Sequence, residues 1–276
     1  MKRLVLLVGL LAACKRPSAP HVDALDVRVH VLGPDALPVP DQAELQQLTA
    51  AAITASPAAF AYDPTGKPST KLVVTLEIGW QPGTLHSQTR ATLEPRAEDA
   101  GTMRITREAQ LEKANAATFP TLDEVRSHLR RALALTVGSA VASERLWLGP
   151  PEAIRAAITS KDPDLRLDAM EFAGLRHDRE AVPALIATLK SGDEAQRDRA
   201  VGALAELGDV RAVHPLAELA RLDDVDELPK IIDSVARIGG PEAEAYLTLV
   251  AEAHQLSDIR EMAKRALEHL VSRAAK

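Results

Sequence analysis

Three segments in the second half of the chain repeat one another. Residues 162–185 read DPDLRLDAMEFAGLRHDREAVPAL, residues 193–216 read DEAQRDRAVGALAELGDVRAVHPL, and residues 224–247 read DVDELPKIIDSVARIGGPEAEAYL. Each segment starts 31 residues after the one before it and ends in leucine. Self-similarity at one fixed period indicates structural repeats that stack on one another.

Each repeat predicts two short antiparallel helices. Asp162 and Asp193 stand directly before helical runs, where an aspartate side chain can cap the first free amides. Gly208 and Gly239 follow such runs, where a glycine in a left-handed conformation ends a helix. Because a single helix pair cannot bury its apolar stripe, neighbouring pairs must stack. We therefore predict an all-α helical solenoid over residues 149–276.

The pattern D-P-x-[VL]-R followed by L-G-D-x-x-A-V-x-x-L, carried mostly by the first two units, resembles HEAT repeats of the short, PBS-lyase-like type. The resemblance covers nearly half the chain and implies a surface that binds another protein. The third unit departs from the pattern, with Leu228 in place of the arginine and Gly240 in place of the aspartate. Some PBS-lyase-like proteins attach bilins, but these repeats contain no cysteine, and we predict that the protein is not an enzyme.

One arginine recurs at an equivalent repeat position, as Arg166, Arg197 and Arg260. The interpretation that we favour is a structural ladder, in which these arginines join the repeats through carboxylates such as Asp178 and Asp209. The alternative interpretation is a stripe that binds an acidic partner.

The N-terminus reads MKRLVLLVGLLAACKRPSAP over residues 1–20. A short basic start is followed by an apolar stretch from Leu4 to Leu11, which is too short for a bilayer span of about 20 residues. Two small alanines then precede Cys14, the only cysteine in the chain. A basic start, an apolar stretch and small residues in this order indicate an export signal.

Residues 11–14, LAAC, resemble the bacterial lipobox. The resemblance implies removal of residues 1–13 as a signal peptide, lipid attachment at Cys14, and membrane anchoring in the cell envelope. Residues 14–21 then form a short linker that keeps the first domain near the bilayer. Lys15, rather than aspartate, follows the cysteine, which favours the outer over the inner membrane by the family's sorting rule. An ordinary secretory signal and an uncleaved N-terminal helix are the alternatives.

Residues 22–148 predict a small α+β domain. Residues 71–80 read KLVVTLEIGW, a run of β-branched and apolar residues typical of a strand. Thr121 with Glu124 forms a capping-box pattern at the start of a long helix, and Asp41 is suited to cap an earlier one. The expected order is β-α-β-β-β-α, and we predict an antiparallel sheet with the helices packed on one face.

The charge balance argues against a nucleic-acid partner. The chain carries a net charge of −6, and residues 149–276 hold 17 Lys and Arg against 24 Asp and Glu. An acidic surface repels phosphate backbones. The acidic cluster over residues 223–227 is interpreted as a solvated turn rather than a calcium site, and we predict no metal and no cofactor.

We therefore interpret the protein as a membrane-anchored envelope lipoprotein that acts as a scaffold or adaptor for another protein. The alternative is an enzyme or a small-molecule-binding module with its site within residues 22–148. Convergence of His86, Glu94 and Glu112 in one pocket would favour the enzyme. His86 and His128 are each interpreted as an exposed loop or helix-face residue.

Overall fold

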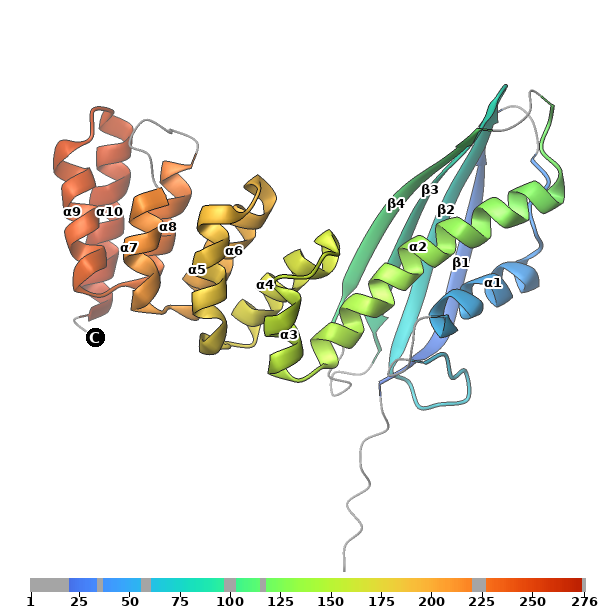
Figure 1. The fold of residues 1–276 in the computed structure, drawn as a ribbon, viewed down its shortest axis with the longest axis horizontal. Coiled ribbons are helices and arrows are strands. Elements are labelled where there is room, and N and C mark those ends of the chain that lie inside the picture. Colours follow the sequence, from blue (N-terminus) through green and yellow to red (C-terminus); the bar gives the residue numbers. More distant parts are fainter. Residues whose placement is uncertain are drawn as a thin grey trace, which may run out of the picture.

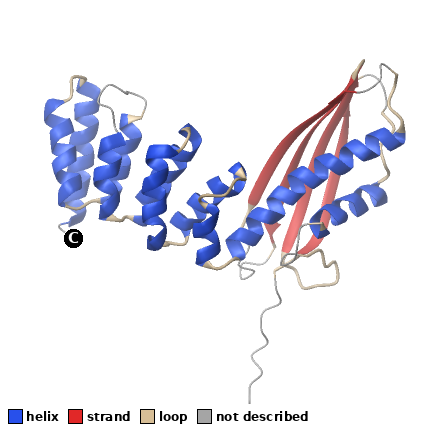
Figure 2. Ribbon diagram, in the orientation of Figure 1, coloured by secondary structure: helices blue, strands red, loops and turns tan. Residues whose placement is uncertain are grey.

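The computed structural model describes residues 20–33, 37–55, 61–96, 103–114, 118–219 and 227–274. The chain forms a sheet unit followed by a row of stacked helices (Figure 1). Figure 2 shows the strands gathered in the first half and helices alone in the second. The predicted fold class, an α+β unit followed by a helical solenoid, is confirmed.

The sheet unit has the predicted order of elements. Its four strands and two helices are β1 (Val22–Leu32), α1 (Gln42–Thr54), β2 (Thr70–Gln81), β3 (Thr84–Pro95), β4 (Ile105–Ala114) and α2 (Leu122–Leu148). The Asp41 side chain accepts a hydrogen bond from the Glu44 amide at the start of α1. Thr121 and Glu124 form the full capping box at the start of α2.

The sheet is mixed, with strand order β1-β2-β3-β4. The prediction of a fully antiparallel sheet is wrong for the first pair, because β1 and β2 run parallel. The reason is the connection: α1 lies between these strands and crosses the face of the sheet, so the chain re-enters the sheet at the same end. The β2–β3 and β3–β4 pairs are antiparallel, and Gly83 (φ +93°) supplies the left-handed turn between β2 and β3.

The core of this unit lies between the sheet and the helices. Alternate residues of β2 are fully buried, namely Leu72, Val74, Leu76 and Ile78, because successive strand side chains point to opposite faces. Both helices cover the same face, as Figure 1 shows. The opposite face is polar and carries cross-strand ion pairs such as Arg90 with Glu108.

The array consists of two rows of helices. One row contains α4 (Pro163–Leu175), α6 (Glu194–Leu207), α8 (Leu228–Ile238) and α10 (Ser257–Ala274), each in contact with the next. The other contains α3 (Pro151–Ala157), α5 (Val182–Ser191), α7 (Val213–Leu219) and α9 (Pro241–Ala253). Short 3₁₀ turns, η2 (Arg179–Ala181) and η3 (Val210–Ala212), lead into α5 and α7.

The predicted helix signals act as expected in the first two units. The Asp162 and Asp193 side chains accept hydrogen bonds from amides in the first turns of α4 and α6. Gly208 ends α6 in a left-handed conformation with φ +60°. The divergent third unit differs, because α8 has no side-chain cap, and Gly239 and Gly240 both take positive φ before α9 begins.

Helix α2 belongs to both regions. It packs on β3 and β4, and it also contacts α4, the first helix of the neighbouring row. At this junction Arg107 of β4 forms an ion pair with Asp168 of α4, and the Ser143 hydroxyl of α2 donates to the same carboxylate at 2.5 Å. The Trp147 and Phe172 rings meet edge to face with centroids 5.2 Å apart. The first repeat is therefore packed directly against the sheet unit.

In the part of the chain that the structure describes, no helix is both long and apolar enough to cross a membrane.

Candidate functional site

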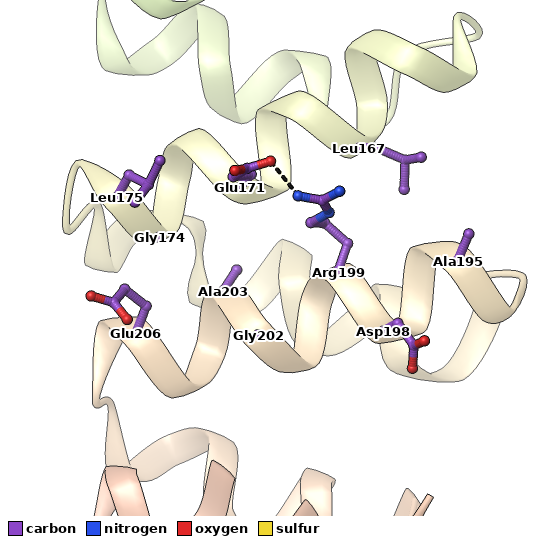
Figure 3. Close-up of a pocket in the computed structure, with 10 residues that line it drawn as sticks. All are labelled: Leu167, Glu171, Gly174, Leu175, Ala195, Asp198, Arg199, Gly202, Ala203 and Glu206. Carbon is purple, nitrogen blue, oxygen red and sulfur yellow. Dashed lines mark hydrogen bonds and ion pairs between the residues drawn. The ribbon is translucent and has the colours of Figure 1, made fainter. Parts of the chain in front are cut away.

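A groove of about 540 Å³ lies between α4 and α6 on the outer surface of their row (Figure 3). Its walls are mostly apolar or small side chains of the two helices. They are Leu167, Gly174, Leu175, Ala195, Gly202 and Ala203. Leu175 is 45% exposed, which leaves an apolar wall of the groove in contact with solvent.

The width of the groove is set where the two helices approach each other. A Cβ added to Gly174 would lie 3.1 Å from the Cα of Ala203, so α4 and α6 touch at this point through backbone and small side chains. Larger residues there would push the helices apart. The groove is therefore a consequence of small residues at the repeat contact.

An ion pair spans the groove at its middle. Arg199 of α6 binds Glu171 of α4, and Figure 3 shows this pair bridging the two helices. The two side chains are 43% and 38% exposed. The pair divides the groove into two ends, each with an apolar wall.

Each end of the groove also carries a carboxylate of α6. Asp198 lies toward one end and Glu206 toward the other (Figure 3). Asp198 pairs with Lys230 at 3.1 Å, and Glu206 pairs with Arg237 at 2.6 Å, both basic residues belonging to α8. Three acids and one base line the groove, so its own charge is negative.

Gly202 lies in the interior of α6 and is exposed. A Cβ added to it would meet nothing within 4 Å, and its φ is not in the left-handed region. A glycine at such a position costs about 0.5–1 kcal/mol of helix stability relative to alanine. Neither the backbone nor the packing of the described residues explains the glycine.

A second groove, of about 620 Å³, lies at the edge of the array between η3 and the start of α9. Its charged lining residues are Arg211, His214 and Glu242. Arg211 is paired with Asp209 and His214 with Glu218. This groove carries no excess of negative charge of its own.

The repeated arginines lie close to the turns that join the helices. The Arg197 guanidinium donates to the Gly192 carbonyl at 2.7 Å, and that of Arg260 donates to the carbonyls of His254 and Gln255. The Nε of Arg166 is buried without a hydrogen-bond partner among the described residues. Arg197 and Arg260 thus bind backbone carbonyls at the end of the helix that precedes each of them.

The carboxylates proposed as their partners bind other arginines. Asp178 pairs with Arg155 at 2.8 Å, and Asp209 pairs with Arg211 at 2.8 Å. The Arg211 side chain also holds the pKa of the Asp209 carboxyl below its ordinary value by hydrogen bonding. A ladder between repeats does exist, but it is formed by Glu171, Asp198 and Glu206 with bases of the next helix in the row. The sequence does not reveal this ladder, because both partners of each pair lie on exposed helix faces that follow no motif.

The three candidate residues for an enzyme do not converge. His86 and Glu112 are cross-strand neighbours on the open face of the sheet. Glu94 lies eight residues further along β3, or about 26 Å at 3.3 Å per residue, where it pairs with Arg104. The three side chains therefore share no pocket.

A serine–histidine pair forms inside the sheet unit, and the expectation of an exposed His128 is wrong because α2 buries this side chain against the sheet. The Ser87 hydroxyl and His128 Nε2 are 2.8 Å apart, and both side chains are buried between β3 and α2. Burial lowers the pKa of His128 to about 4, so the imidazole is neutral at physiological pH. Since His128 is 1% exposed, a substrate could reach this pair only by displacing α2.

The predicted lipid-attachment residue and most of the acidic cluster are not among the residues that the structure describes. Cys14 lies outside the described residues, as do Asp223, Asp224 and Asp226 of the acidic cluster. Within the described residues, no group of three or more His, Cys, Asp and Glu side chains is arranged to hold a metal ion.

Residues 150–231 match the family model for HEAT repeats. The predicted HEAT repeats are thereby confirmed. Two curated relatives are bilin biosynthesis proteins PecE: one from Nostoc sp., 32% identical over 113 residues, and one from Mastigocladus laminosus, 32% identical over 111 residues. The matches cover 39% and 38% of this chain and 45% and 41% of the relatives, so the chain spans under half the length of these proteins.

Among solved structures, the chain is similar to an engineered protein with 22% sequence identity and a TM-score of 0.34. The match covers 54% of this chain and 74% of the engineered one.

Proposed function

We propose that the protein is a lipid-anchored adaptor of the cell envelope, which binds a partner protein through its HEAT repeats and has no catalytic activity of its own. The observation that carries the proposal is the open groove between α4 and α6, on repeats of a family model matched over residues 150–231. Stacked repeats bind partners through extended surfaces to which successive helices contribute.

The anchor is proposed from the N-terminal sequence. The LAAC pattern at residues 11–14 places a thiol where a lipobox requires one, and no other cysteine competes for modification. Lipid chains contribute about 0.8 kcal/mol per buried methylene, so two or more chains hold a protein stably. Lys15 after the cysteine favours the outer membrane.

Crosslinking in intact envelopes tests the adaptor. A lysine-reactive crosslinker reports which region touches the partner, because both regions carry exposed or partly exposed lysines. We expect partner crosslinks at lysines of the array, namely Lys161, Lys190, Lys230 and Lys264. Crosslinks confined to Lys67, Lys71 and Lys113 of the sheet unit would contradict binding through the repeats.

Membrane fractionation tests the anchor separately. The Cys14→Ser variant should move from the membrane pellet to the soluble fraction, and mass spectrometry should lose the lipidated N-terminal peptide. Lys15→Asp is the matched control, since it keeps the lipid and should shift the protein toward the inner membrane. A Cys14→Ser protein that remains in salt-washed membranes would refute the lipid anchor.

A further inference from the structure

We infer that the groove between α4 and α6 binds an amphipathic helix of the partner, which carries two basic residues seven or eight positions apart beside apolar ones. The inference rests on the proposed function, because it names the surface and the chemistry of the partner. It is carried by the shape, the charge and the unexplained glycine of the groove.

The shape of the groove suits a helix. It is a depression between two neighbouring helices of one row that run in the same direction, with Leu167 and Ala195 at one end and Leu175 and Ala203 at the other (Figure 3). An amphipathic helix places its apolar face in such a groove and contacts it through side chains one or two turns apart. Apolar side chains at both ends of the bound helix would therefore be covered.

The charge of the groove selects basic residues in the partner. Asp198 and Glu206 are eight residues apart on α6, which places them about 12 Å apart along the helix axis. Their present partners, Lys230 and Arg237, are 53% and 51% exposed. Exposed pairs of this kind hold weakly, so a basic side chain of the partner can share or replace them.

The bases that pair with these two carboxylates belong to α8 and lie outside the lining of the groove, whereas the base of the central pair lies within it. Arg199 is already bound to Glu171 across the groove, and the pair is close to neutral as a unit. A partner helix that runs along α6 thus meets one carboxylate at each end and a neutral middle. This spacing requires two Lys or Arg residues on one face of the partner helix.

Gly202 lies between the two carboxylates in the sequence of α6. Because a Cβ there would meet no described residue within 4 Å, the structure leaves space above it for a partner. A helix-interior glycine lowers helix stability relative to alanine. A glycine at this position would allow a partner backbone to approach α6 closely. The isolated chain offers no such reason for the glycine.

Two synthetic peptides of identical composition provide the test. Both are helical and carry the same leucines, but one places two lysines seven positions apart on the leucine face, and the other places them on the opposite face. Fluorescence anisotropy measures their binding to the full chain. We expect the first peptide to bind at least ten times more tightly than the second.

Paired variants locate the binding site. Gly202→Leu should weaken the first peptide at least tenfold, whereas Gly138→Leu should not, because Gly138 is a similarly open glycine within α2 and outside the groove. Asp198→Asn with Glu206→Gln should also weaken it tenfold. The control is Glu244→Gln with Glu252→Gln, two exposed acids eight residues apart on α9.

Equal binding of both peptides, no binding of either, or equal effects of the Gly202 and Gly138 variants would overturn the inference. Circular dichroism of each variant separates loss of binding from loss of folding. Envelope crosslinking distinguishes the two proposals: if Gly202→Leu still captures the partner through array lysines, the adaptor stands and this groove is wrong. If the peptide results hold but no partner crosslinks to the array, the adaptor fails and the groove remains a peptide-binding site.

Discussion

The contacts within the sheet unit differ in kind from the contacts within the array. In the array, the ion pairs of the surface ladder join residues about one repeat apart, with separations of 28, 31 and 32 residues. In the sheet unit, the buried polar contacts join residues with no periodic relation, such as Ser87 with His128 and Met103 with Glu144. The array can therefore be recognised from a repeated sequence, whereas the sheet unit depends on long-range pairing.

The two regions also differ in where they place charge. The array keeps its ladder on the surface, with side chains 38–53% exposed. The sheet unit buries ionisable groups: burial raises the pKa of Glu144 to about 7 and lowers that of His128 to about 4. We therefore expect stability to depend on pH mainly through the sheet unit and only weakly through the array.

The largest expected effect comes from truncating one core leucine in each region. Leu133→Ala in α2 and Leu247→Ala in α9 both remove fully buried side chains, and each should cost about 3 kcal/mol. Because repeats contact only their neighbours, the Leu247 variant should open α8 to α10 while the sheet unit stays protected. Hydrogen exchange measures this. Uniform loss of protection in the Leu247 variant would show that the two regions unfold as one.

The junction between the regions should show the next largest effect. Asp168→Ala leaves the partly buried Arg107 without its ion-pair partner, which should cost about 2 to 3 kcal/mol. Denaturant unfolding measures the loss, and small-angle scattering would show a changed angle between the regions. Asp233→Ala, an exposed acid of α8 away from the junction, serves as the control. A junction variant as stable as this control would mean that α2 alone fixes the two regions.

Substitution of Glu144 is expected to raise the stability of the folded chain instead of lowering it. Its pKa of about 7 in the folded chain exceeds the ordinary value of 4.5, so the folded state binds the proton more tightly than the unfolded state does. Stability from this group is therefore present below pH 4.5 and is lost as pH rises through 7. Glu144→Gln should raise stability at pH 8 by about 2 kcal/mol, while one oxygen still accepts from the Met103 amide.

Thermal unfolding between pH 4 and 8 measures this dependence. Glu144→Gln should lose the contribution that falls from pH 4.5 to 7, so its stability should rise more steeply with pH over this range than that of the unaltered chain. The opposite effect of His128, whose lowered pKa destabilises the fold as pH falls from 6.5 to 4, should remain in that variant. An unchanged profile would show that the Glu144 carboxyl is solvated.

The smallest effect is expected on the surface of the array. Arg237→Met removes the partner of Glu206, and both side chains are more than 40% exposed. Such exposed pairs contribute about 0.5 kcal/mol or less. Chemical denaturation at low and high salt checks the value. A loss above 1 kcal/mol would mean that the ladder acts as a cooperative network, which would weaken the contrast between the two regions.

Much of the array could be predicted because its signals are local. Asp162, Asp193 and Gly208 act within one turn of their own position, and so their role follows from the sequence alone. The groove could not be predicted, because it depends on how closely Gly174 and Ala203 bring two helices together. The ladder that lines it joins exposed charges, which are common on every helix surface.

The sheet unit shows the limit of sequence patterns more clearly. The order of strands and helices follows from hydrophobic periodicity and capping, but the direction of β1 relative to β2 does not. That direction depends on where α1 crosses the sheet. The burial of His128 and Glu144 likewise follows from the face that α2 turns toward β3 and β4.

The sequence by itself determined that the second half of this chain contains stacked HEAT repeats, and it predicted an acylated Cys14. Both follow from residues close together or repeated at a fixed spacing, whose effects need no knowledge of distant contacts. The tertiary structure alone decided the parallel strand pair, the buried ionisable groups, the shared helix α2, and the acidic groove with Gly202 open to solvent. These features depend on which surfaces pack against each other, and packing couples residues that no local pattern connects.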